Sequence, residues 1–170
     1  MHRRSQPFAH GHRFDLLAII LSLAIACLAF FASPARTFLA DSDPWSASQT
    51  IDPATLLKEM AAKDATSRPV VVCVGFHSLY HGAHIPGASY HGPGSTPEGL
   101  AGLKKFAQTL PRSANLVVYC GCCPLEHCPN IRPAFVALRD AGFTHLRVLI
   151  LPHDFASDWV AKGYPVSRGD

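Results

Sequence analysis

Three short apolar runs, rich in β-branched residues, alternate along the chain with segments of helical pattern. The runs are Val70–Val74, Leu116–Tyr119 and Leu146–Leu151. The helical segments span residues 52–63, 97–110, 130–141 and 154–162. Continuous apolar runs of this length are typical of strands that are buried on both faces, as in a parallel sheet. The alternation therefore predicts an α/β fold, a small, open, mostly parallel sheet flanked by helices on both faces.

Several residues mark the expected ends of these elements. Asp52 followed by Pro53 is typical of a helix start, because the carboxylate can cap the first turn and proline suits its first position. Asn130 is expected to cap the helix over residues 130–141, and Gly142 is expected to end that helix. Residues 77–90 contain many turn-forming residues and are predicted to be a loop.

Composition limits the classes of protein that fit. The 170 residues suffice for one ordinary domain and an appendage, and 48% of them are hydrophobic, enough to form a buried core. The net charge of +3 is small. Beyond the N-terminus the arginines are scattered, so no nucleic-acid partner is expected.

The N-terminal segment is predicted to lie outside the domain. Arg3, Arg4 and Arg13 precede an apolar run over residues 16–31, and Ser33-Pro34-Ala35 follows. This pattern is typical of a secretory signal, although residues 16–31 could also remain as a membrane anchor. The predicted organisation is a signal peptide or anchor over 1–35, a linker over 36–44 and a domain over 45–168. The domain is expected to be exported, to the periplasm or another extracytoplasmic space.

Four of the six cysteines lie within nine residues. They are Cys120, Cys122, Cys123 and Cys128. Cysteines this close together cannot staple distant parts of a fold, so local chemistry is the better explanation. Cys73 lies within a predicted strand and is expected to be a buried small apolar residue.

The position of Cys120 suggests a nucleophile. A strand, a tight loop and a helix start follow one another there, which places Cys120 at the carboxyl end of the strand, where sites of open α/β sheets lie. Backbone N–H groups of the loop and of the helix start are expected to face this sulfur. Such donors favour an anion and would lower the pKa of the Cys120 thiol.

Three stretches resemble the rhodanese-like (sulfurtransferase) domain family. His84-Ile85-Pro86-Gly87-Ala88 is similar to an element that follows the second core strand of the family. Val117-Val118-Tyr119-Cys120 is similar to the strand that leads into the family's active-site cysteine. The ending with Gly142-Phe143, Trp159 and Gly163-Tyr164-Pro165-Val166 resembles the C-terminal part of the family's domain.

The resemblance implies a mechanism and a set of site residues. Cys120 would take a sulfane sulfur from a small donor, hold it as a persulfide and pass it to a thiol or other nucleophilic acceptor. The surrounding active-site loop would include Gly121, Cys122, Cys123, His127, Cys128, Asn130 and Arg132. No cofactor is implied, and the membrane would be contacted only through the N-terminal anchor.

The loop also departs from the family pattern. It is longer than usual, and Arg132 is the first cation after Cys120. Thiosulfate is a dianion, so a loop without nearby Lys or Arg is expected to bind it poorly, and Glu126 adds repulsion. Sulfur chemistry with another donor is therefore the expectation.

Other readings of the loop remain open. Cys120, Cys122, Cys123 and Cys128 could bind zinc or copper(I), which favour thiolate ligands, in a non-catalytic module. Cys128 could instead resolve a persulfide on Cys120, or pair with Cys122 or Cys123, as a dithiol redox partner. An internal disulfide on an inactive domain is a third possibility, and Cys123 competes with Cys120 as the nucleophile.

Overall fold

The computed structural model describes residues 43–170. The predicted signal peptide or anchor and most of the predicted linker lie outside the described residues. None of the helices within 43–170 is long and apolar enough to cross a membrane.

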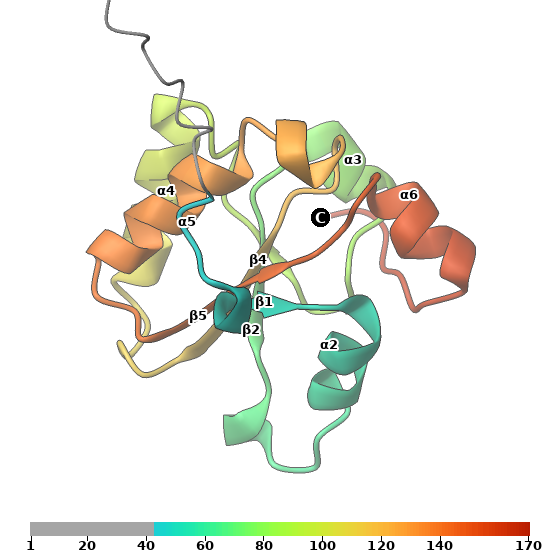
Figure 1. The fold of residues 1–170 in the computed structure, drawn as a ribbon, viewed down its shortest axis with the longest axis horizontal. Helices are drawn as coiled ribbons and strands as arrows, with labels where there is room; N and C mark the ends of the chain where they lie inside the picture. Colours follow the sequence, from blue (N-terminus) through green and yellow to red (C-terminus); the bar gives the residue numbers. More distant parts are fainter. Residues whose placement is uncertain (1–42) are drawn as a thin grey trace, which may run out of the picture. The chain divides into compact units, whose positions relative to one another are not determined.

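Five parallel strands form one open sheet (Figure 1). They are β1 (Thr50–Ile51), β2 (Val70–Cys73), β3 (Ser89–Tyr90), β4 (Asn115–Tyr119) and β5 (His145–Leu149). Their order in the sheet is β1-β5-β4-β2-β3, and each neighbouring pair is parallel. The predicted fold class, an open parallel sheet of α/β type, is confirmed.

Helices cover both faces of this sheet. They are α2 (Pro53–Met60), α3 (His77–Gly82), α4 (Pro97–Ala107), α5 (Ile131–Asp140) and α6 (Phe155–Asp158), with short 3-10 segments η1 (Ala47–Gln49), η2 (Ala65–Ser67), η3 (Leu125–His127) and η4 (Val160–Lys162). Buried side chains of α4 and α5 pack on one face, and those of α2, α3 and α6 pack on the other. Figure 1 shows α4 and α5 together on one side of the strands.

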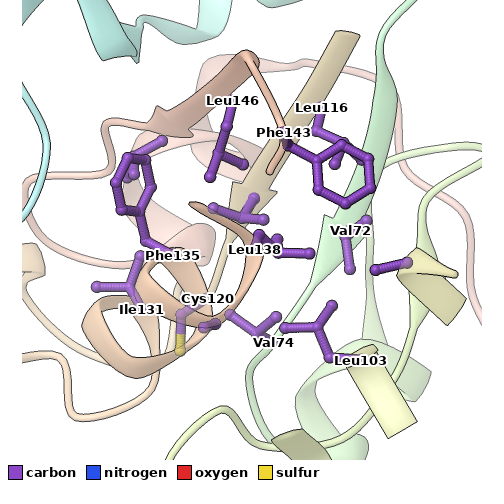
Figure 2. Packing of buried hydrophobic residues seen from close by; sticks show 14 of the residues in the cluster. Val72, Val74, Leu103, Leu116, Cys120, Ile131, Phe135, Leu138, Phe143 and Leu146 are labelled. Carbon is purple, nitrogen blue, oxygen red and sulfur yellow. The ribbon is translucent and has the colours of Figure 1, made fainter. Parts of the chain in front are cut away.

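Strand β4 shows why the apolar runs are continuous. Leu116, Val117 and Val118 are fully buried, because successive side chains point to opposite helical layers. Burying each such side chain contributes about 1.5–3 kcal/mol. The alternation continues past the strand, so Tyr119 faces the α2–α3–α6 layer and Cys120 faces the α4–α5 layer. Figure 2 shows Cys120 in the α4–α5 cluster with Ile131 and Val74.

The prediction of a loop over residues 77–90 is wrong at two places. The helix α3 and the short strand β3 both lie in that range. Helix α3 has no side-chain cap, and Tyr80 is its buried residue, so its sequence has little helical signal. Strand β3 has two residues and exists through its pairing with β2, which the local sequence does not encode.

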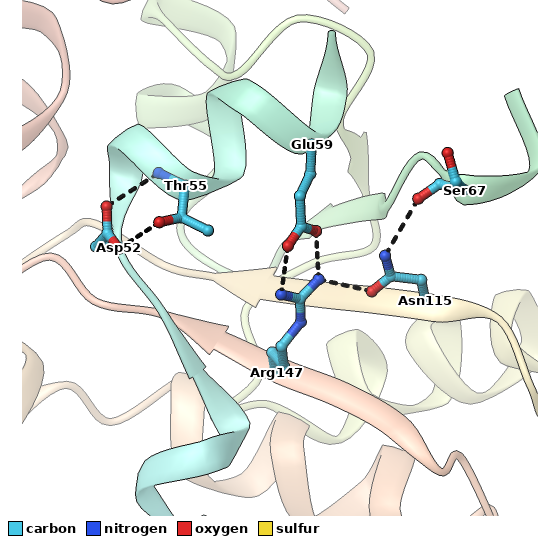
Figure 3. A network of polar contacts seen from close by, with 6 residues as sticks. All are labelled: Asp52, Thr55, Glu59, Ser67, Asn115 and Arg147. Carbon is cyan, nitrogen blue, oxygen red and sulfur yellow. Dashed lines mark hydrogen bonds and ion pairs between the residues drawn. The ribbon is translucent and has the colours of Figure 1, made fainter. Parts of the chain in front are cut away.

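A polar network joins α2 to strands β4 and β5, at the end of the sheet opposite the cysteine loop (Figure 3). The Arg147 guanidinium on β5 donates to both carboxylate oxygens of Glu59 at 2.8 and 2.6 Å and to Asn115 Oδ1 at 2.8 Å. The start of α2 is capped as predicted, because the Asp52 carboxylate accepts from the Thr55 backbone at 3.0 Å. These contacts lie away from the cysteine loop and serve the stability of the fold.

Candidate active site

The loop that follows β4 brings three sulfur atoms together. The Sγ atoms of Cys120, Cys122 and Cys128 all lie within 4.8 Å of one another. The Cys120 and Cys122 sulfurs are 3.1 Å apart. Cys123 is outside this group of three, although its sulfur is 3.2 Å from that of Cys122. Each of these cysteines is a free thiol.

Gly121 makes the turn that places Cys120 and Cys122 side by side. Its φ of +72° lies in the left-handed region, which favours glycine. A Cβ atom at this position would lie 2.7 Å from the Cβ of Phe155, and the Gly121 carbonyl accepts the Phe155 N–H at 3.0 Å. The loop is therefore fastened to the start of α6 at its tightest point.

Asn130 connects the sulfurs to a neighbouring loop. Its fully buried side-chain NH₂ group donates to Cys120 Sγ at 3.4 Å and to Cys122 Sγ at 3.6 Å. Its Oδ1 accepts from the Ser95 backbone at 3.1 Å and from the Ser95 hydroxyl at 2.7 Å. The two Ser95 donors fix the orientation of the amide, so the NH₂ group must face the sulfurs. Asn130 occupies the predicted cap position of α5, but its side chain does not cap the helix.

The favoured site for negative charge is Cys128, which corrects the expectation for Cys120. Hydrogen bonding from the Cys120 thiol, and then the backbone N–H groups of Asn130 and Ile131 at the start of α5, hold the pKa of Cys128 below its usual value against the opposing effect of burial. The same hydrogen bond to Cys128, followed by burial, raises the pKa of Cys120. The helix start thus favours a thiolate on Cys128 over one on Cys120.

Arg132 holds the loop rather than the sulfurs. Its guanidinium donates to the carbonyls of Leu125 at 3.1 Å and Cys128 at 3.3 Å, forms an ion pair with Asp43 at 2.6 Å and lies over the Trp45 ring at 5.6 Å. Each of these contacts holds the loop in place. Arg132, the first cation after Cys120, therefore braces the longer loop.

His127 is placed at the surface of the loop. Its exposed side chain forms a pair with the exposed Glu126 carboxylate at 3.1 Å. The group of three sulfurs does not include it. Of the predicted loop residues, the structure brings Cys122, Cys128 and Asn130 onto Cys120, whereas His127 and Arg132 make contacts elsewhere.

A pocket of about 450 Å³ opens beside Cys120, Gly121 and Cys122. Its walls include side chains that the sequence did not associate with the site. Among them are the apolar side chains of Leu79, Ala83, Phe155 and Val160, the cation of Arg168 and the carboxylate of Asp154, which caps α6. Arg168 reaches this place because the C-terminal tail pairs with the loop after α3 through two Ser167–His84 backbone hydrogen bonds of 2.9 Å, and its guanidinium donates to the Gly82 carbonyl.

Cys73 also lines the pocket, from the end of β2. It is 3% exposed, and burial raises the pKa of its thiol to about 11. A thiol with so high a pKa stays protonated near neutral pH and is a poor nucleophile. The chemistry of the pocket therefore belongs to the loop cysteines.

No protein-family model and no curated protein sequence matches the chain. Solved structures do match. The protein BH2092 from Bacillus halodurans is 21% identical, with a TM-score of 0.55, over 71% of this chain and 77% of that one. A variant of EanB carrying a cysteine persulfide, with ergothioneine, is 20% identical, with a TM-score of 0.52, over 70% of this chain and 28% of that one.

A third match names the fold. The Alr3790 protein from Anabaena sp. is 24% identical, with a TM-score of 0.53, over 69% of this chain and 82% of that one. The matching region of Alr3790 is known as a rhodanese-like domain. The open parallel sheet with helices on both faces thus has the fold of the rhodanese-like domain of Alr3790.

Proposed function

We propose that this domain is a sulfurtransferase-type enzyme in which Cys120 accepts a sulfane sulfur, holds it as a persulfide and passes it to a thiol or other nucleophilic acceptor. The observation that supports this most directly is the position of Cys120. It lies at the carboxyl end of β4, beside a pocket, and its sulfur is within hydrogen-bonding reach of Asn130 and Cys122.

The first step begins with proton transfer from Cys120 to Cys128. The Cys128 thiolate, stabilised by the start of α5, accepts the proton of the Cys120 thiol. As this proton moves, the Cys120 sulfur attacks the outer sulfur of the donor. A new S–S bond forms on Cys120, the donor's bond to that sulfur breaks, and its electron pair leaves with the remainder of the donor.

The Asn130 amide supports the negative charge during this step. Its NH₂ group donates to Cys120 Sγ at 3.4 Å and lowers the pKa of Cys120, opposing the larger effects of Cys128 and burial. A hydrogen bond to an anion is about twice as strong as one to a neutral group. The amide therefore contributes most when the sulfur, or the persulfide that replaces it, is charged.

The walls of the pocket favour a donor with an apolar body. Leu79, Ala83 and Phe155 offer apolar surface beside the cysteine loop. The charged lining residues are one cation, Arg168, and one carboxylate, Asp154, so the walls suit low charge better than a dianion. A small dianion such as thiosulfate would leave this apolar surface unused. An aryl thiosulfonate, with an apolar ring and one negative charge, fits the same walls better.

The fold can accommodate the proposed intermediate. The EanB variant, which shares this fold, carries a cysteine persulfide.

We extend the proposal to the compartment in which the domain acts: residues 1–35 direct export. N-terminal sequencing of the chain recovered from an extracytoplasmic fraction tests this, and an intact Met1 in a membrane-free cytoplasmic fraction would contradict it.

Sulfinate release from benzenethiosulfonate tests the function. The wild-type chain, reduced and freed of reductant, is expected to release one equivalent of benzenesulfinate in a single turnover, because each sulfur transferred liberates one sulfinate. Cys120→Ser is expected to release none. Cys73→Ala is the control, because that thiol lines the same pocket but stays protonated. Equal release from wild type and Cys120→Ser would exclude Cys120 as the acceptor.

The competing function is a soft-metal module. Three sulfurs within 4.8 Å could bind zinc or copper(I). Metal analysis of protein purified without chelator distinguishes the two functions. Stoichiometric metal, lost in Cys120→Ser, together with no sulfinate release, would replace the enzyme proposal with the binding module.

A further inference from the structure

We propose that Cys122 is a resolving cysteine, which attacks the persulfide on Cys120, closes a Cys120–Cys122 disulfide and releases the transferred sulfur as hydrogen sulfide. This inference rests on the proposed function, because it requires a persulfide on Cys120. It adds a second fate for that persulfide, which needs no acceptor in the pocket.

The distance between the two sulfurs supports this role. Cys120 Sγ and Cys122 Sγ are 3.1 Å apart, and a disulfide requires about 2.05 Å. A movement of about 1 Å closes the bond. Gly121 supplies the turn between the two residues, with its φ of +72° and its packing against Phe155, so the loop already holds them side by side.

Cys122 is better placed for this attack than the other two loop cysteines. The sulfur of Cys123 lies 3.2 Å from that of Cys122, and Cys123 is not in the group of three sulfurs that contains Cys120. Cys128 is 3% exposed and does not line the pocket. Cys122 is half-buried, lines the pocket beside Cys120 and touches the Cys120 sulfur.

Asn130 orients both sulfurs for the reaction. Its NH₂ group donates to Cys120 at 3.4 Å and to Cys122 at 3.6 Å, while Ser95 fixes the amide from the other side. One fixed donor group that contacts both sulfurs restricts their relative position. Restricting reacting atoms in this way lowers the entropic part of the barrier.

The step balances without an outside oxidant. The Cys122 sulfur bonds to the inner sulfur of the persulfide, and the bond between inner and outer sulfur breaks. The outer sulfur leaves with the electron pair and takes the proton of the Cys122 thiol. The sulfane sulfur is reduced by two electrons to sulfide, and Cys120 and Cys122 are each oxidised by one electron to the disulfide. An external thiol reductant then restores both cysteines for the next cycle.

The test follows the sulfur after transfer. The full chain, reduced and freed of reductant, is given one equivalent of benzenethiosulfonate without oxygen. Benzenesulfinate reports transfer to the protein, and sulfide reports the second step. Wild type is expected to release sulfide in step with sulfinate, to lose two thiols and to yield a Cys120–Cys122 disulfide on peptide mapping.

Two variants separate the steps. Cys122→Ser is expected to release sulfinate but no sulfide, and to retain the mass of one extra sulfur atom on Cys120. Cys123→Ser is the matched control, because it removes the adjacent thiol and leaves the 3.1 Å contact in place, so sulfide release is expected to persist.

Three results would overturn the inference. The first is a wild-type chain that keeps its persulfide, and the second is equal sulfide release from wild type and Cys122→Ser. The third is a disulfide that maps to Cys120–Cys128. In each of these, sulfinate release still supports the proposed function. Absence of sulfinate from wild type and Cys122→Ser alike would contradict the proposed function itself, and the inference with it.

Discussion

The buried amide of Asn130 shows how single residues organise this site. Each of its hydrogen-bonding groups has partners: Ser95 donates to its oxygen, and its NH₂ group donates to two sulfurs. Burying such a group is favourable only when these partners are present. Asn130 was expected both as a helix cap and as a residue of the active-site loop; its side chain does not cap α5, and its amide contacts Cys120 and Cys122.

The charge on Cys128 predicts a pH dependence. Its pKa is lowered in the folded chain, below the roughly 8.5 of a free cysteine. The thiolate, and the stability it contributes, are fully present above that ordinary value and are lost as the pH falls through the lowered pKa. Single-turnover sulfinate release should therefore persist below pH 8 and decline only in acid.

Cys128→Ser is the matching variant. Without the proton acceptor, Cys120 must lose its proton to solvent, so the pH profile of sulfinate release should move to higher pH. The far-ultraviolet absorbance of the thiolate at neutral pH should disappear with it. Identical profiles for wild type and Cys128→Ser would show that Cys128 does not accept this proton.

Gly75 allows the close approach of Cys120. A Cβ atom there would lie 2.9 Å from the Cys120 carbonyl oxygen and 3.4 Å from its sulfur. Gly75→Ala is therefore expected to lower the free energy of unfolding by about 1–3 kcal/mol, as overpacking does, and to slow sulfinate release. Urea unfolding measures the first effect.

Gly82→Ala is the control for that substitution. Gly82 lies in α3 with nothing within 4 Å of a built Cβ atom. Alanine restricts the unfolded chain more than glycine does, so stability should stay the same or rise by up to about 1 kcal/mol. Equal destabilisation by both variants would contradict the close-packing explanation at Gly75.

Among the elements, the connection from β4 to α5 has two distinct parts. Cys120, Gly121 and Cys122 form a tight turn at its start, fastened to α6, and Cys128 meets their sulfurs from the far end of the connection. The rest contains η3 and is braced by Arg132 through two carbonyls and Asp43. Arg132 thus ties the long part of the connection to the rest of the domain.

Strand β5 and helix α2 are joined by the Glu59–Arg147 pair. Arg147→Ala is expected to lower the free energy of unfolding by about 1–3 kcal/mol, because it leaves a partly buried carboxylate and Asn115 without their donor. Arg139→Ala removes an exposed pair with Asp140 and should cost at most about 0.5 kcal/mol. Chemical unfolding of both variants checks the contrast.

The stabilisation from the Glu59–Arg147 pair is lost in acid. The Arg147 hydrogen bond holds the pKa of Glu59 below its usual value. The contribution of the pair to the free energy of unfolding is therefore complete above the pKa of about 4.3 that Glu59 has in the unfolded chain. It is lost as the pH falls through the lowered pKa of the folded chain. The stability difference between wild type and Arg147→Ala should narrow in acid, and a difference that is constant with pH would contradict the ion pair.

At the scale of the described domain, the sheet brings distant segments to one edge. The pocket combines the ends of β2 and β4 with α3, α6 and the C-terminal tail. Each contributes a different property: sulfur from the β4 loop, apolar surface from α3 and α6, and positive charge from Arg168. This arrangement follows the general rule that sites of open α/β sheets lie beyond the carboxyl ends of the strands.

The role of the tail leads to a prediction for Arg168. Arg168→Ala removes the cation of the pocket while the backbone pairing of Ser167 with His84 remains. The KM for benzenethiosulfonate should rise several-fold with little change in kcat, since a cation in the pocket wall attracts donor and transition state alike. Steady-state kinetics with an added thiol reductant measures this. A change in kcat alone would instead place Arg168 in the chemical step.

The sequence by itself determined the α/β architecture and the place of Cys120 after β4. Both depend on local patterns: apolar runs that must be buried on two faces, and a turn that follows one of them. The short elements α3, β1 and β3 were not predicted, because their stability comes from pairing and packing with remote segments. Leu79 and Arg168 were not predicted as pocket residues for the same reason: packing of remote segments brings them to the cysteine loop.

Only the tertiary structure decided how the cysteines divide their roles. The start of α5 and the Cys120 thiol both lower the pKa of Cys128, whereas the contact with Cys128 and burial raise the pKa of Cys120, the residue that the strand presents to the pocket. Ser95, 35 positions from Asn130 in sequence, fixes the amide that holds the other two sulfurs. Proton affinity depends on which donors surround each sulfur in space, and sequence spacing does not contain that information.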